Sequence, residues 1–221
     1  MISTVTGRLV LDDRVAPGRL TIDDGRITAV EIDVDGVPGD APYVAPGFVD
    51  VHVHGWGGHD AMGDAAALDG MARALLRRGV TSFLPTAVTA PLDALAAFAD
   101  RVRAWMPSAP DDGAEPLGFN LEGPFLAAAK RGAHAESHLR SPASASREAL
   151  ESLVDGLRLL TIAPELPGAT HLIGWLEGRG VAVSLGHSAA AAAEAWAGYA
   201  AGARSTTHLF NAMSGVEHRS P

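Results

Sequence analysis

Residues 46–54 have the sequence PGFVDVHVH, a Pro-Gly turn followed by valines that alternate with Asp and His. This pattern predicts a β-strand that starts just after the turn. From this point onward, short apolar or β-branched runs alternate with stretches rich in alanine and leucine, which is typical of repeated strand–helix–strand units. The sequence therefore predicts an α/β fold built on a parallel sheet.

Six strands and five helices are expected in this part of the chain. The predicted strands span residues 48–54, 81–84, 117–122, 157–163, 181–187 and 204–208, and the helices lie near residues 64–78, 91–105, 146–153, 169–179 and 189–200. A long irregular stretch, residues 123–145, follows the third strand. Barrel enzymes keep their functional loops at the carboxyl ends of the strands, so we expect this stretch to be an active-site loop.

The first 45 residues show a different pattern. Residues 19–22 and 26–31 alternate between apolar and polar side chains around Asp24-Gly25, a dipeptide typical of a two-residue hairpin turn. We therefore expect two domains, in which residues 1–45 form a small β-sheet unit and residues 46–221 form the α/β part.

The composition limits the partners. The 221 residues have a formal net charge of −9, and so acidic a chain suits neither nucleic acid nor an anionic membrane surface as its main partner. No apolar run approaches the roughly 18 residues of a membrane span, and the N-terminus lacks a signal-peptide pattern. Without cysteine, any metal must be held by histidine and carboxylate, and we expect a cytoplasmic protein.

Candidate metal ligands fall at the ends of the predicted strands. His52 and His54 lie two residues apart on the first strand, so their side chains share one face. Glu122 ends the third strand, and His187 and His208 end the fifth and sixth. Individually, the histidines could be hydrogen-bonded core or cap residues, and the glutamate could be an ion-pair partner. Their coincidence at one end of several strands favours a metal site.

Several motifs together resemble the N-acetylglucosamine-6-phosphate deacetylases of the amidohydrolase superfamily. They are PGFVDVHVHG at residues 46–55, GVTSFLPT at 79–86, LEGPF at 121–125, KRGAH at 130–134, SLGHS at 184–188 and THLFNAM at 207–213. The motifs occur in order and cover nearly the whole chain, and as a set they are far more specific than the His-x-His pair. The resemblance implies a (β/α)8 TIM-type barrel, of which about six βα units fall in this chain, with a small N-terminal β-sandwich portion.

The resemblance also implies a metal cofactor. In the family, the residues that match Glu122, His187 and His208 hold a divalent ion, most commonly zinc, and members without the first-strand pair bind one. Because His52 and His54 are both present here, we expect one or two ions per subunit, with Glu122 bridging a pair. Such an ion lowers the pKa of water toward about 7 and polarises an amide carbonyl.

Substrate contacts follow from the same resemblance. His134, our catalytic candidate, matches the family histidine near the acetyl and sugar groups, and Ala133 precedes it in the same motif. Asn211 and Ala212 match positions that contact the sugar phosphate, the latter through its backbone, and Arg219 matches the arginine for the 6-phosphate. Without the resemblance, His134 and Arg219 would be interpreted as solvated side chains. We expect a small sugar-phosphate substrate and a homodimer of the full-length protein.

The family pattern continues beyond residue 221, because it requires eight barrel strands and a catalytic aspartate on the eighth. We therefore expect an inactive fragment of an enzyme that converts N-acetylglucosamine 6-phosphate to glucosamine 6-phosphate and acetate in amino-sugar catabolism. One alternative is another amidohydrolase that acts on a cyclic amide, although the glutamate on strand three, rather than a lysine on strand four, weighs against it. The other is a non-catalytic protein that binds metal or sugar phosphate.

Overall fold

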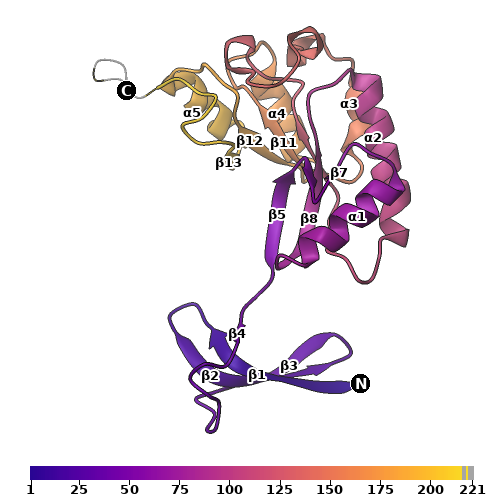
Figure 1. Ribbon diagram of the computed structural model, residues 1–221. Coiled ribbons are helices and arrows are strands. Elements are labelled where there is room, and N and C mark those ends of the chain that lie inside the picture. Colours follow the sequence, from indigo (N-terminus) through magenta and orange to yellow (C-terminus); the bar gives the residue numbers. More distant parts are fainter. Residues whose placement is uncertain (216–217, 219–221) are drawn as a thin grey trace. The chain divides into compact units, whose positions relative to one another are not determined.

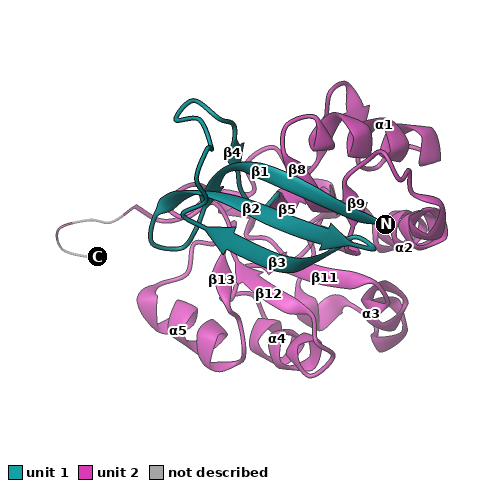
Figure 2. Ribbon diagram, turned by 90° about the horizontal axis from the view of Figure 1, so that it is seen from below, with its two compact units in different colours: residues 1–47 teal, residues 48–221 magenta. Residues whose placement is uncertain are grey.

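The computed structural model describes residues 1–215 and residue 218. The chain divides into two compact units, Met1–Gly47 and Phe48–Pro221, which are coloured separately in Figure 2. The first unit contains a four-stranded sheet, and the second contains a larger parallel sheet that is covered by helices.

The first unit has the strand order β3-β2-β1-β4, with β1 (Ile2–Val10), β2 (Val15–Asp23), β3 (Arg26–Ile32) and β4 (Tyr43–Val44). As the sequence predicts, β2 and β3 form an antiparallel hairpin. Asp24 and Gly25 both have positive φ, 46° and 73°, which a type I′ turn requires at its two central residues. Residues 1–47 form one sheet, so the β-sandwich implied by the family stays a prediction.

The second unit is a parallel half-barrel. Its strands follow the order β13-β12-β11-β10-β8-β5, and a short strand, β9, also pairs with β8. Each adjacent pair along this path is parallel, as the alternation of strands and helices predicts. The strands are β5 (Phe48–Val53), β8 (Val80–Ala87), β9 (Glu115–Pro116), β10 (Phe119–Glu122), β11 (Leu157–Ile162), β12 (Ala182–Leu185) and β13 (Ser205–Thr206).

Helices connect these strands and lie around the outside of the sheet (Figure 2). They are α1 (Ala65–Leu76), α2 (Leu92–Trp105), α3 (Arg147–Val154), α4 (Ala169–Glu177) and α5 (Ala192–Ala200). Each of the longer helices buries one apolar stripe. On α2 the stripe includes Leu95, Phe98 and Val102, and the Phe98 ring packs edge-on against Phe119 of β10 with 5.7 Å between centroids. The core therefore lies between the helices and the sheet, which leaves the strand ends for polar residues.

Several strand boundaries predicted from the sequence are wrong by one to three residues, and two of them have a clear structural reason. The third strand begins at Phe119 rather than at residue 117, because Gly118 has φ 133° and a Cβ there would lie 2.4 Å from the Gly156 carbonyl oxygen. The second strand continues past residue 84 to Ala87, because Thr86 and Ala87 pair with β10. This extension brings Thr86 to the carboxyl ends of the strands.

Shorter elements fill the connections. A small hairpin, β6 (Gly55–Trp56) and β7 (His59–Asp60), follows β5, and a 3-10 turn, η1 (Met106–Ser108), follows α2. The stretch 123–145 contains three more 3-10 turns, η2 (Ala128–Lys130), η3 (Glu136–His138) and η4 (Pro142–Ser144). Among the residues that the structure describes, every helix is too short or too polar to cross a membrane.

Candidate metal centre

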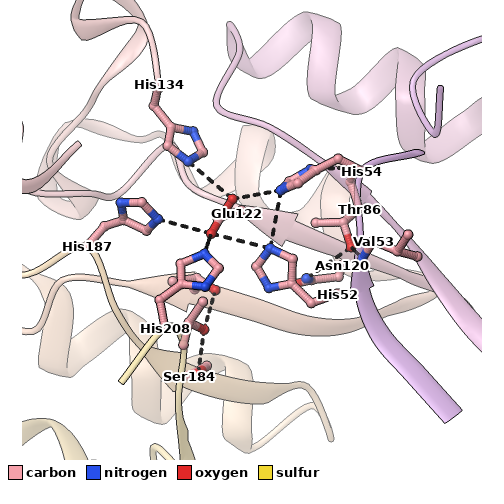
Figure 3. Close-up of polar contacts among 12 residues, drawn as sticks. His52, Val53, His54, Thr86, Asn120, Glu122, His134, Ser184, His187 and His208 are labelled. Carbon is pink, nitrogen blue, oxygen red and sulfur yellow. Dashed lines mark hydrogen bonds and ion pairs between the residues drawn. The ribbon is translucent and has the colours of Figure 1, made fainter. Parts of the chain in front are cut away.

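Histidines surround one buried carboxylate at the carboxyl ends of the strands (Figure 3). The carboxylate is that of Glu122, the last residue of β10, whose side chain is 3% exposed. Because carboxyl ends of parallel strands meet at one end of a barrel, residues far apart in the sequence converge there. The histidines are His52 of β5, His54 directly after β5, His134 in the loop after β10, His187 after β12 and His208 after β13.

One oxygen of Glu122 faces three of these histidines. Oε1 lies 2.7 Å from His208 Nε2, 3.0 Å from His187 Nε2 and 3.3 Å from His52 Nε2. The structure thus brings Glu122, His187 and His208 together, as the strand-end pattern predicts, with His52 beside them. Their assignment as metal ligands stays a prediction.

The other oxygen, Oε2, lies 2.9 Å from His54 Nε2 and 3.2 Å from His134 Nε2. Burial alone would raise the pKa of Glu122, but hydrogen bonds from the histidines, led by His134 and His187, outweigh burial and hold that pKa below its ordinary value. Glu122 is therefore an ionised carboxylate, which is costly to bury without cations or donors around it.

The second ring nitrogen of His187 faces a carbonyl. Nδ1–H donates to the Lys130 carbonyl oxygen over 2.8 Å, while Nε2 faces Glu122. A neutral ring with its proton on Nδ1 presents a lone pair at Nε2, so a metal ion or a second proton must lie between Nε2 and the carboxylate. Burial lowers the pKa of His187, but the hydrogen bond to Glu122 and the Lys130 carbonyl outweigh it and the net pKa is raised.

His54 has the same arrangement. Its Nδ1–H donates to the Thr86 carbonyl oxygen over 3.1 Å, and its Nε2 faces Glu122. The pKa of His54 is lowered by burial but raised overall, mainly by the hydrogen bond and the charge of Glu122. Metal-binding histidines in proteins commonly donate their other N–H to a carbonyl in this way.

His134 has the opposite arrangement. The Thr89 backbone N–H donates to His134 Nδ1 over 3.2 Å, so Nδ1 is the acceptor and the ring proton lies on Nε2, toward Glu122. The side chain of His134 is 5% exposed, and its ring stands edge-on to that of His187 with 4.8 Å between centroids. His134 is therefore placed as a hydrogen-bond donor and not as a metal ligand.

The donor atoms fit a divalent ion. Two groups have potential ligand atoms within 4.8 Å of one another, one of His52, Glu122 and His208 and the other of Glu122, His134 and His187. His134 does not belong to the second group as a ligand, because its Nε2 carries a proton. His208 takes its place, since both His208 and His187 face Oε1 of Glu122. Imidazole nitrogens with one carboxylate suit zinc and neighbouring transition metals.

The backbone at this site is unusual. His187 and His208 have φ values of 50° and 53°, in the left-handed region that non-glycine residues rarely adopt. Each such residue costs on the order of 1–3 kcal/mol, and such residues cluster at functional sites. Both histidines lie just after their strands, which end at Leu185 and Thr206, and not within them as the sequence predicted.

The predicted substrate residues that the structure describes lie in the loops around this cluster. Ala133 is exposed beside His134. Asn211 and Ala212 follow His208, the Asn211 side chain is exposed, and the Ala212 carbonyl accepts the Ser188 N–H over 3.1 Å. Arg219 lies outside the residues that the structure describes.

Sequence reasoning missed several residues that support the site. The Thr86 carbonyl and the Thr89 N–H fix the rings of His54 and His134. Glu165 accepts the Ser188 hydroxyl over 2.7 Å and the Ala189 N–H over 2.6 Å, which anchors the chain after His187. Glu165 lies shortly after the end of β11. The position of a carboxylate at a strand end, which identified Glu122, could therefore have identified Glu165 as well.

Residues 43–220 match the model of the amidohydrolase family, which covers most of the chain. The chain belongs to the amidohydrolase family. Members of this family generally depend on divalent metal ions, and this amidohydrolase has side chains able to hold one.

The amidohydrolase is 39% identical over 226 residues to N-acetylglucosamine-6-phosphate deacetylase from Bos taurus and 40% identical over 214 residues to N-acetylgalactosamine-6-phosphate deacetylase from Escherichia coli O157:H7. These matches cover 98% and 96% of this chain but 52% and 55% of the relatives. The crystal structure of the Thermotoga maritima N-acetylglucosamine-6-phosphate deacetylase matches with a TM-score of 0.87 at 32% identity, over 99% of this chain and 57% of that chain. The chain thus resembles these deacetylases throughout and spans about half the length of the curated relatives it matches.

Proposed function

We propose that the complete protein is a metal-dependent deacetylase that converts N-acetylglucosamine 6-phosphate to glucosamine 6-phosphate and acetate. The main support is the convergence of histidine Nε2 atoms on the ionised Glu122, an arrangement suited to a divalent ion. The names of the similar proteins suggest the substrate class, an N-acetylated amino-sugar phosphate.

Zinc is the metal that we propose. Glu122, His187 and His208 would hold the first ion, and His52 and His54 would hold a second beside Glu122. When bound, the metal acts as a Lewis acid toward the amide carbonyl and lowers the pKa of water. The Lys130 and Thr86 carbonyls accept Nδ1–H of His187 and His54, which would leave the Nε2 lone pairs of both rings to bind the ions.

His134 would act on the substrate directly. The Thr89 N–H keeps the ring proton on Nε2, where it faces Glu122 in this structure and would turn to a substrate oxygen when the metal occupies the carboxylate. In a bound amide, this N–H can donate to the carbonyl oxygen, on which negative charge develops as the carbon becomes tetrahedral. A donor fixed before the substrate arrives needs no reorganisation during the reaction, which is the source of its benefit.

The sugar phosphate would be held by the loops beside the metal. We assign these contacts to Ala133, Asn211 and Ala212, with Arg219 for the phosphate. For the complete protein we also propose a closed eight-stranded barrel beside a β-sandwich, and assembly as a homodimer. The cytoplasmic location expected from the sequence stays a prediction.

A second substrate follows from one specific similarity. The Escherichia coli relative named for N-acetylgalactosamine 6-phosphate is 40% identical to this chain, about as similar as the relatives named for the glucosamine compound. The two sugars differ only in the configuration at C4, so both present the same acetamide and phosphate to the proposed site.

Acetate release by the full-length gene product tests the proposal. The zinc-loaded protein should release acetate from N-acetylglucosamine 6-phosphate, and its kcat/KM for the galactosamine compound decides between the two sugars. Ring opening of a dihydropyrimidine, assayed in parallel, represents the cyclic-amide alternative. Ring opening without acetate release would overturn the proposal, and metal binding without either reaction would favour a non-catalytic protein.

A further inference from the structure

Lys130 is the only lysine among the 17 Lys and Arg residues of the sequence. It ends η2, is half-buried, and is followed directly by an arginine, Arg131. Arginine is therefore the basic side chain used everywhere else in this sequence. The two are not equivalent, because lysine has a compact ammonium with three donors and arginine has a planar fork. The chemistry at position 130 is thus distinct from that of every arginine in the sequence.

The main chain of Lys130 supports a proposed metal ligand. Its carbonyl oxygen accepts Nδ1–H of His187 over 2.8 Å. Three residues earlier, the Ala127 N–H donates to the His187 carbonyl oxygen over 2.9 Å. The segment from Ala127 to Lys130 therefore fixes both the ring and the backbone of His187.

The side chain of Lys130 reaches a different loop. Nζ donates to the Met213 carbonyl oxygen over 2.8 Å. Met213 lies at the end of residues 209–213, the loop that follows His208 and contains Asn211 and Ala212. Lys130 therefore contacts both His187, which follows β12, and the loop 209–213, which follows β13.

Ser188 also contacts this loop. The Ser188 N–H donates to the Ala212 carbonyl over 3.1 Å, and Ser188 also forms a β-bridge with Met213. The Lys130 ammonium and Ser188 thus both hold the end of the loop, whereas Leu209 and Phe210 at its start are exposed.

We propose that Lys130 is a positioning residue that couples the His187 ligand to the loop 209–213 and so sets the sugar-phosphate subsite. The main-chain carbonyl orients the ring of His187, and the ammonium holds the loop 209–213. The inference rests on the proposed function, because the role of Asn211 and Ala212 in binding the sugar phosphate belongs to that function. The two contacts of Lys130 can be tested separately, since a substitution of the side chain removes the ammonium and keeps the main-chain carbonyl.

Kinetics of three variants of the zinc-loaded, full-length protein test the proposal. Lys130→Met keeps most of the length of the side chain but removes the donor, so KM for N-acetylglucosamine 6-phosphate should rise about tenfold, the loss expected from one hydrogen bond to a charged group. The bound zinc per subunit should not change. Lys130→Arg should recover part of the lost affinity, and Arg131→Met, the neighbouring cation, should stay within about twofold of the parent.

Hydrogen exchange gives a readout that needs no activity. The amides of residues 209–213 and of Ser188 should exchange faster in Lys130→Met and at the parental rate in Arg131→Met. If the parent protein fails to act on the sugar phosphate, the proposed function fails, and the exchange data still decide whether Lys130 holds the loop. Unchanged exchange in Lys130→Met would overturn the inference, as would an unchanged KM or a loss of zinc in that variant.

Discussion

The loop after β10 and the loop after β12 each place one buried histidine against Glu122, and the two rings differ in where they hold their proton. His134 accepts the Thr89 N–H at Nδ1, whereas His187 donates from Nδ1 to the Lys130 carbonyl. Both rings are nearly inaccessible, and both present Nε2 to the carboxylate, over 3.2 and 3.0 Å. Proximity and burial therefore do not distinguish them.

The difference lies in the backbone partner of the far nitrogen. A carbonyl partner leaves a lone pair at Nε2, which suits a metal, and an N–H partner leaves a proton there, which suits a substrate oxygen. One cluster of similar histidines can thus supply both ligands and a donor. The comparison predicts that substitutions of the two histidines have separable effects.

The largest effect should come from His187→Asn. Removal of a ligand should weaken zinc binding by more than about 100-fold, beyond the 10–100-fold typical of losing an outer partner, and activity should fall with it. Zinc titration of the full-length variant measures the change, with His171→Asn, an exposed histidine on α4, as the matched control. Parental zinc affinity in His187→Asn would remove this histidine from the metal site.

His134→Asn should leave zinc binding intact. Because the variant loses one donor to the developing oxyanion, kcat should fall by about 10²–10³-fold. Zinc content and kcat, measured on the same preparation, test both parts of the prediction. A loss of zinc comparable with that in His187→Asn would show that the two histidines are equivalent, against the comparison.

Substitution of His52 and His54 on the first barrel strand should have a smaller effect, on the number of zinc ions bound per subunit. If Glu122 bridges two ions, the parent should bind up to two zinc ions per subunit, and His52→Ala combined with His54→Ala should bind one fewer. Metal analysis after dialysis measures this directly. An unchanged metal content would mean that His52 and His54 serve only as hydrogen-bond partners of Glu122.

The pH dependence should also differ between the two histidines. The pKa values of His187 and His54 are raised above the ordinary 6.5. Protons therefore begin to compete with the metal at these rings above pH 6.5, and the affinity for zinc should fall as the pH is lowered toward that value. Each displaced proton contributes up to about tenfold per pH unit. His187→Asn should reduce this slope and His134→Asn should not, as calorimetric titrations between pH 6 and 8 can test.

Much of the sheet and the gathering of the histidines was predictable from the sequence. The alternation of strands with helices predicts the parallel order, and side chains at strand ends must meet at one end of such a sheet. Glu122, His187 and His208 were therefore expected near one another. The hairpin at Asp24-Gly25 followed from local turn chemistry.

The roles of the individual rings could not be predicted in this way. They depend on Thr89 and Lys130, which contact the histidines through backbone atoms, and backbone contacts leave no signature in residue type. The start of β10 was also missed, because Gly118 adopts a positive φ only where Gly156 comes close in the fold. Such features arise from contacts between distant segments.

The ring nitrogens on which His134 and His187 hold their protons can be measured directly. Long-range ¹H–¹⁵N correlation spectra of the zinc-loaded, full-length protein distinguish ring tautomers, and the His134→Asn and His187→Asn variants assign the two signals. The spectra should show a protonated Nε2 in His134, and in His187 a protonated Nδ1 with a metal-bound Nε2. The same tautomer in both rings, or a metal-bound His134, would contradict this assignment.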